Sequence, residues 1–430
     1  MNDIDKLKED IKSENNNINY LFGCIMLLLA FIMVLYSITS SNKSIGINDL
    51  IIVSLLIIIN LIGYALILLP MIAERSNYFF LKQNILISWL IPPVILLLSI
   101  LLISSMSELN TTNNSTDFFV LFKYLLYVLL PITVVSLTRL KSLKPIIEKP
   151  LIDLIIFLFL LFWVWWGIEF NNDLNLFPDL VHGMGYLLNL LAFLVLTWSF
   201  FVIQDVEINR SFSRLFTKSN LKVVGTWLVI LLLIIVPIGL VISFLAINPD
   251  NLVKKGPLGA LGYLILAVVG VFLVQGIGEE MLFRGFFYFI LKKKLENLSE
   301  EMRGYVLVCL FFLVAGLICL TPYIGLADPI NDGIVNSTVI PLTTIYPIIG
   351  IFYFTIGILV MYKTKDLTLT MVVWSSMLFG WAHFEDWRYL IFATIAGFGY
   401  CETYRRTNNL FAGSTLHMLV DVTWGAVLSV

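Results

Sequence analysis

The chain has 430 residues, of which 59% are hydrophobic and only 13% are charged, and its formal net charge is −2. Soluble proteins average about 25% charged residues, so this composition excludes a soluble enzyme, a secreted disulfide scaffold and a disordered chain. No basic region is present, which argues against nucleic acid as a partner. The sequence therefore predicts an all-α, polytopic transmembrane helical bundle in contact with membrane lipids. Its apolar runs are continuous and do not alternate as the strands of a β-barrel do.

Apolar runs of about 20 residues, the length that crosses a membrane, occur about thirteen times along the chain. They are Tyr20–Ile38, Leu50–Ala73, Asn84–Ser104, Phe118–Leu137, Leu151–Phe170, Val181–Gln204, Val223–Ile247, Leu258–Leu291, Tyr305–Thr321, Ile340–Tyr362, Leu367–Phe384, Tyr389–Tyr404 and Phe411–Val430. If the N-terminus is cytoplasmic and the spans alternate, 21 of the 27 Lys and Arg residues fall in cytoplasmic segments and 4 in outer ones. This bias predicts a multi-pass protein, in the cell membrane if the source is prokaryotic, with its N-terminus cytoplasmic and its C-terminus outside.

Ionisable residues divide the chain into two regions. Within the spans of residues 1–250 they are scattered, whereas residues 251–430 hold three clusters. An ionisable side chain inside a span costs several kcal/mol and is a functional hypothesis by default. We therefore expect 1–250 to be an accessory transmembrane region and 251–430 to carry the chemistry.

The first cluster is the segment GEEMLFRGFF, which places two glutamates and an arginine within one apolar run. That run has 34 residues, about 51 Å as a helix, and Gly276 and Gly278 offer a break or kink before the acids. On a helix Glu280 and Arg284 face each other at i,i+4, while Glu279 points about 140° away from Arg284. Glu280 would then be a neutralised structural partner and Glu279 a desolvated general base. A buried ion pair that only holds the bundle together is the alternative.

Two further clusters contain histidine, of which the chain has only three. In SSMLFGWAHFEDW, His383 lies one helical turn after Phe379. In GSTLHMLVDVTWG, His417 and Asp421 lie at i,i+4 and can share a face. Asp421 could orient the imidazole, or both groups could donate to a developing oxyanion. Each motif alone also fits a satisfied histidine or a polar clamp between helices.

Counted from the expected cytoplasmic boundary at about 1.5 Å per residue, the motifs reach similar depths. Glu279 lies about 20 Å deep, His383 about 27 Å, and His417 and Asp421 about 17 and 23 Å. Independent clamps have no reason to share a level, so this coincidence predicts a single site near the middle of the bilayer.

A carboxylate and two imidazoles in a dry cavity can activate water and stabilise an oxyanion, which is the equipment for peptide hydrolysis. In a metal-free form, Glu279 with His383 deprotonates water. In a metal-dependent form, Glu279, His383 and His417 bind Zn²⁺, which acidifies the water. The residue types leave both forms open, although no HExxH pair is present.

The three motifs, E-E-x3-R, F-x3-H and H-x3-[ND], resemble those of the CAAX-protease and bacteriocin-processing family of intramembrane proteases, which is related to the type II CAAX prenyl endopeptidases. The similarity covers roughly residues 270–425 and includes YRRTNNL before the last histidine helix. It implies an intramembrane endopeptidase acting on a membrane-associated peptide or a prenylated protein.

The same resemblance implies roles for the motif residues. Glu279 activates water with His383 as its partner, and His417 and Asp421 form the oxyanion site. Glu280 and Arg284 support them. Members of the family are commonly labelled metalloproteases, so Zn²⁺ is an open cofactor.

The chain also departs from the family pattern. About 100 residues, with two extra spans near 305–362, separate the first two motifs, where the family has a short loop. A catalytically silent scaffold or bacteriocin self-immunity protein is therefore an alternative function, and a proton-coupled transporter is another.

Overall fold

The computed structural model describes residues 18–29, 149–159, 208–248, 253, 256–323, 334–335, 338–339 and 341–429. The chain divides into two compact units, Met1–Ser213 and Arg214–Val430. In the first unit the helices Ile18–Leu29 and Pro150–Phe159 are described. The predicted spans 50–73, 84–104, 118–137 and 181–204 lie outside the described residues. The predicted functional boundary at residue 250 stays a prediction.

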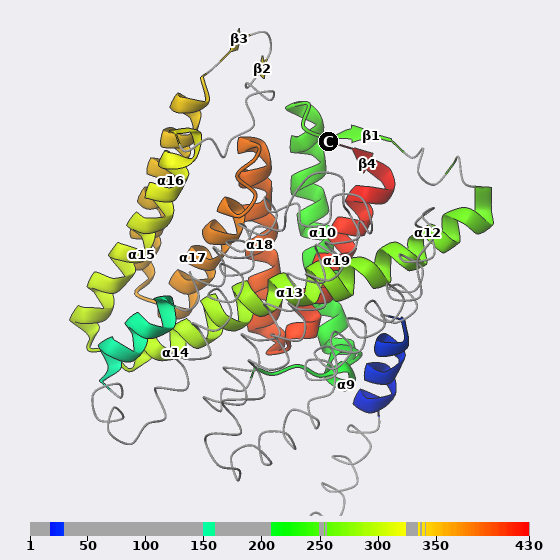
Figure 1. The fold of residues 1–430 in the computed structure, drawn as a ribbon, viewed down its shortest axis with the longest axis horizontal. Helices are drawn as coiled ribbons and strands as arrows, with labels where there is room; N and C mark the ends of the chain where they lie inside the picture. The colour runs from blue at the N-terminus through cyan, green and yellow to red at the C-terminus, as the bar shows by residue number, and fades with distance from the viewer. Residues whose placement is uncertain are drawn as a thin grey trace, which may run out of the picture. The chain divides into compact units, whose positions relative to one another are not determined.

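The second unit is a helical bundle whose elements follow in chain order (Figure 1). After α9 (Phe212–Leu215), the α-helices are α10 (Lys218–Val241), α12 (Gly256–Val271), α13 (Ile277–Glu280), α14 (Leu291–Glu296), α15 (Glu300–Leu320), α16 (Leu342–Thr364), α17 (Leu367–Trp381), α18 (Trp387–Thr407) and α19 (Leu410–Val427). The π-helices η3 (Phe272–Gly276) and η4 (Met281–Ile290) and the 3₁₀ turn η5 (Thr321–Tyr323) join them.

Short strands close two of the connections. Strand β1 (Ala246–Ile247) pairs antiparallel with β4 (Leu428–Ser429), with Ala246 opposite Ser429, which ties the end of α10 to the end of α19. Strand β2 (Ile334–Val335) pairs antiparallel with β3 (Thr338–Val339) between α15 and α16.

Among the residues that the structure describes, three helices are long and apolar enough to cross a membrane: α10, Glu300–Tyr323 and α16. Helices capable of spanning a membrane are thus confirmed at three of the predicted positions. The predicted total of about thirteen spans is not confirmed, since α17 has only 15 residues and much of the N-terminal region lies outside the described residues.

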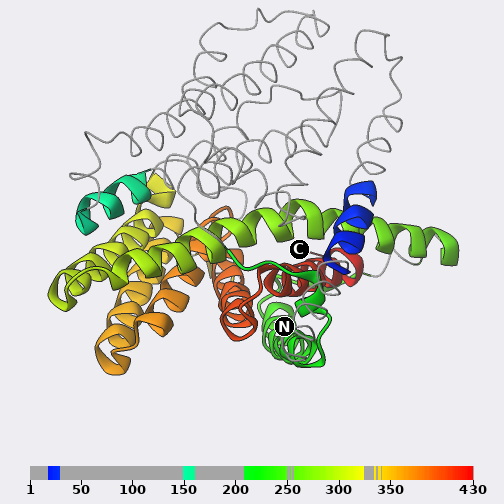
Figure 2. The ribbon, with the colours of Figure 1, turned by 90° about the horizontal axis from the view of Figure 1, so that it is seen from below.

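One helical path runs without interruption from Gly256 to Glu296 through α12, η3, α13, η4 and α14. The predicted break at the glycines is replaced by π-helical turns on both sides of α13, and Gly276 keeps helical angles of φ −58° and ψ −47°. A π-turn absorbs an extra residue without ending the helix and often occurs at functional sites. Figures 1 and 2 show this long helix crossing the direction of α10 and α15 to α18 along one face of the bundle.

The inserted helices α15 and α16 pack side by side through glycines. A Cβ at Gly350 would lie 2.6 Å from Cys319 Sγ, and one at Gly357 would overlap the Phe311 ring. Trp374 of α17 donates its indole N–H to the Leu310 carbonyl of α15 at 2.9 Å. The insertion is therefore joined to the helix that carries the second motif.

Helix boundaries follow the local sequence. Lys365 ends α16 in the left-handed region, with φ 52°. Asp366 then caps α17 by accepting a hydrogen bond from the Thr368 N–H at 2.8 Å. Asn409 caps α19 in the same way, accepting from the Phe411 N–H at 3.3 Å. These two short turns set the directions of the helices that carry the histidine motifs.

The close approach of α15 and α16 predicts that Gly357→Ala is destabilising. The added methyl group meets a Phe311 ring that is 1% exposed, so we expect a loss of about 1–3 kcal/mol. Thermal denaturation in detergent measures it. Gly316→Ala on α15 is the control, because its Cβ would meet no atom within 4 Å. Equal stabilities of the two variants would contradict this packing.

Candidate active site

A fully buried ion pair forms the base of the site. Arg284 Nη1 lies 3.1 Å from Glu280 Oε1, and both side chains are 0% exposed. The i,i+4 pair predicted from the first motif is thus confirmed. Arg284 Nη2 donates to the Gly397 carbonyl at 2.9 Å, and its guanidinium carbon lies 4.4 Å from the Phe379 ring centroid. The pair therefore connects the long helix to α17 and α18.

His417 lies between this pair and the two remaining carboxylates of the motifs. Its Nδ1 is 3.1 Å from Glu280 Oε1. Its Nε2 is 3.3 Å from Asp421 Oδ2 and 3.8 Å from Glu279 Oε2. The side chain is 4% exposed, so α19 presents the imidazole directly to the first motif.

The two adjacent glutamates occupy different environments. Glu280 is fully buried and paired, whereas the side chain of Glu279 is 33% exposed. Glu279 Oε2 has no hydrogen-bond partner among the described residues. Asp421 is similarly open, with 31% of its side chain exposed. Glu279 and Asp421 thus form the accessible side of the cluster, and Glu280 forms its buried side.

His383 lies in the turn just after α17. Its Nδ1 is 2.9 Å from the Phe379 carbonyl, which can only accept, so Nδ1 carries the proton and Nε2 is left as an acceptor. Its ring contacts Phe379 at 4.8 Å and Tyr389 at 4.6 Å between centroids. A single tautomer is therefore fixed by the backbone of the same helix.

Phe379 joins the two histidines of the site. Its ring centroid lies 4.8 Å from that of His383 and 5.6 Å from that of His417. No hydrogen bond or ion pair links His383 to Glu279, His417 or Asp421 among the residues that the structure describes. The structure thus brings all the predicted residues close together. Three carboxylates lie around His417, and His383 contacts the same Phe379 ring that His417 contacts.

Sequence reasoning missed three residues that shape the site. Tyr400 stacks on His417 with a centroid distance of 4.5 Å and an interplanar angle of 18°. A Cβ at Gly397 would lie 2.9 Å from Phe379 Cδ1, and one at Gly413 would lie 2.8 Å from Glu280 Oε2. A glycine inside a span is a signal of close approach and could have marked Gly397.

The metal-dependent form requires a set of ligands arranged around one point. Within the described ranges, no group of three or more His, Cys, Asp or Glu side chains is arranged to hold a metal ion. The three residues predicted as zinc ligands, Glu279, His383 and His417, are not such a group.

Comparison with known proteins agrees with the motifs. Residues 261–423 match the family model described as type II CAAX prenyl endopeptidase Rce1-like. The resemblance predicted from the three motifs is thereby confirmed over this segment, which contains all six motif residues. Together with the three apolar helices, it identifies an integral membrane protein. No curated protein and no solved structure matches the chain.

The buried ion pair predicts a large and asymmetric effect on stability. Arg284→Met leaves the Glu280 carboxylate buried without its cation, which costs about 3–5 kcal/mol. Combining Arg284→Met with Glu280→Gln should restore part of the lost stability, because the uncompensated charge is removed. Chemical denaturation in detergent measures both variants.

Lys292→Met is the matched control on the same helical path. Lys292 also forms an i,i+4 pair, 3.0 Å from Glu296, but the two side chains are 24% and 47% exposed. Its loss should cost less than about 0.5 kcal/mol. A similar cost for Arg284→Met would contradict the structural role of the buried pair.

Proposed function

We propose that the segment matching the type II CAAX prenyl endopeptidase family is an intramembrane endopeptidase that hydrolyses a peptide bond of a membrane-associated or prenylated substrate. One observation carries the proposal. The Glu279 side chain is 33% exposed, and its buried Oε2, which has no hydrogen-bond partner among the described residues, lies 3.8 Å from an imidazole that is held by a buried ion pair. A carboxylate in such a position can take a proton from water.

In the first step Glu279 acts as the general base. A water molecule donates one hydrogen bond to the Glu279 carboxylate and the other to Nε2 of His383, the free acceptor of that ring. Glu279 takes the proton, and the oxygen attacks the carbonyl carbon of the scissile peptide bond. His383 orients the water, and its own orientation is fixed by the Phe379 carbonyl.

His417 and Asp421 stabilise the oxyanion that results. Glu280 accepts the Nδ1–H of His417, so the second nitrogen, Nε2, is directed at the open side of the cluster. One guanidinium and three carboxylates surround this ring, and an imidazolium is the form that satisfies both nitrogens. Its Nε2–H, which Asp421 accepts in the resting site, can also be donated to the developing negative charge.

Collapse of the tetrahedral intermediate completes the reaction. The proton taken by Glu279 passes to the leaving nitrogen, the C–N bond breaks, and the products are a carboxylic acid and an amine. Glu279 returns to its ionised form without a covalent intermediate. Glu280 and Arg284 take no part in proton transfer, and their role is to hold His417 in place.

Removing the base should abolish hydrolysis without unfolding the protein. Glu279→Gln keeps the size of the side chain but lowers proton affinity, so we expect a loss of at least about 10²-fold in turnover. Cleavage of a prenylated reporter peptide by the full chain in lipid vesicles measures it. Glu385→Gln, in the exposed turn after His383, is the control and should retain activity.

Retained cleavage by Glu279→Gln would contradict the assignment of the base. A wild-type protein that binds the reporter without cleaving it would favour the silent scaffold, and pH-driven uptake without cleavage would favour a transporter. Activity lost on chelation and restored by Zn²⁺ would favour the metal-dependent form.

Substitution of Asp421 separates the two roles open to it. If Asp421 is protonated and donates to the oxyanion together with His417, Asp421→Asn keeps a donor and should retain most of the turnover. Asp421→Leu should lose about 10²–10³-fold. Steady-state cleavage of the same reporter compares them. Equal, large losses for both variants would show that a carboxylate is required to hold the imidazolium.

A further inference from the structure

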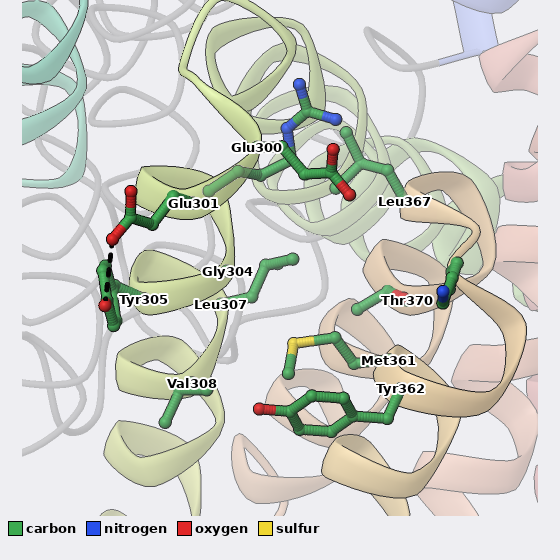
Figure 3. Close-up of a pocket in the computed structure, with 12 residues that line it drawn as sticks. Glu300, Glu301, Gly304, Tyr305, Leu307, Val308, Met361, Tyr362, Leu367 and Thr370 are labelled. Carbon is green, nitrogen blue, oxygen red and sulfur yellow. Dashed lines mark hydrogen bonds between the residues drawn. The ribbon is translucent and has the colours of Figure 1, made fainter.

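A cavity lies away from the candidate active site, where α15 begins, α16 ends and α17 begins. Its volume is about 760 Å³. Figure 3 shows that one wall comes from α15, with Gly304, Leu307 and Val308, and that Met361 and Tyr362 point toward it from α16. The inserted helices α15 and α16 therefore build most of this cavity.

The lining is divided between an apolar wall and a charged mouth. Glu300, Glu301 and Lys365 provide charges of both signs. The side chains of Glu300 and Lys365 form no ion pair or hydrogen bond within the described part of the chain, and Glu301 accepts one hydrogen bond from Tyr305 at 3.2 Å. Arg303 is already engaged, because its guanidinium donates to the Leu295 and Leu298 carbonyls. Three charged groups are therefore available to a ligand.

The cavity lies at the ends of two helices that can cross a membrane. Tyr305 and Tyr362, which line it, are 61% and 67% exposed. Tyrosine is enriched where hydrocarbon meets the polar headgroup region. The charged mouth is thus expected at headgroup level and the apolar wall at the depth of the first acyl carbons.

We propose that this cavity binds a phospholipid with a primary ammonium headgroup, of the phosphatidylethanolamine class. Lys365 pairs with the phosphate, Glu300 and Glu301 accept hydrogen bonds from the ammonium, and the wall of Leu307, Val308 and Met361 contacts an acyl chain. The cavity is within the size range of small-ligand sites. Its charges match a headgroup that carries one charge of each sign.

The same charges disfavour the other occupants. A basic peptide would satisfy the two glutamates but would bring a like charge to Lys365. An anionic lipid without an amine would satisfy Lys365 and leave the glutamates facing negative charge. Phosphatidylcholine has both charges, but its quaternary ammonium cannot donate hydrogen bonds. Of these occupants, only the lipid with a primary ammonium group pairs with Lys365 and also donates hydrogen bonds to the two glutamates.

Native mass spectrometry of the full chain, delipidated in detergent, tests the proposal by titration with phosphatidylethanolamine, phosphatidylcholine and phosphatidylglycerol. We expect one phosphatidylethanolamine to bind roughly tenfold more tightly than the other two, equivalent to one charge-assisted hydrogen bond. Glu300→Gln combined with Glu301→Gln should reduce that preference, whereas Lys365→Asn should weaken the binding of all three lipids, because each of them carries the phosphate. Asparagine suits the left-handed conformation of this position, φ 52°, so the turn is kept.

A second pair of variants tests the cavity itself. A Cβ at Gly304, which lines the cavity, would meet no atom within 4 Å, so Gly304→Leu should fill the space and weaken binding by roughly tenfold. Gly316→Leu on the same helix enters open space outside the lining and should leave binding unchanged. Lys363→Gln is the corresponding control for Lys365.

Three outcomes would overturn the proposal. They are equal binding of the three lipids, equal effects of the cavity variants and their controls, and displacement of the lipid by a Lys-rich peptide. Thermal melting of each variant confirms that it is folded. Because the readout is lipid binding, the result is independent of whether the chain cleaves peptides.

Discussion

The ion pair between Glu280 and Arg284 is the constraint on which the site depends. Both groups are fully buried, and an unpaired charge at such a depth costs several kcal/mol. Arg284 also binds the Gly397 carbonyl of α18, and Glu280 also holds Nδ1 of His417 on α19. One pair thus connects the long helix to α18 and α19. Glu279 and Asp421 remain as the partly exposed charged groups of the site.

The ion pair fits between the helices because the backbone of α18 and of α19 approaches it closely. Gly397 admits the Arg284 guanidinium and Phe379, and Gly413 admits the Glu280 carboxylate, because neither position has room for a Cβ. The π-helical turns on both sides of α13 let the long helix present two neighbouring glutamates to different surroundings. The helix itself stays continuous, so the ion pair rests on a rigid element rather than on a loop.

Local spacing predicted part of this arrangement. The i,i+4 rule was sufficient for Glu280 with Arg284 and for His417 with Asp421. The common depth counted from the basic boundary stays a prediction. Other features of the site are contacts between different helices, which residue spacing within one helix cannot predict. They are the contact of His417 with Glu280, the contacts of Phe379 with both histidines, and the stacking of Tyr400 on His417. Of the break or kink predicted at Gly276 and Gly278, the break did not form, because the helical path stays continuous through π-helical turns.

The protonation of the two site histidines is the most direct measure of this account. The chain has only three histidines, so ¹⁵N nuclear magnetic resonance of the histidine-labelled protein can be assigned by single substitutions. We expect an imidazolium with two protonated nitrogens at His417, and a neutral ring with its proton on Nδ1 at His383. A neutral His417, or a proton on Nε2 of His383, would contradict it, because the oxyanion donor or the water acceptor would then be missing.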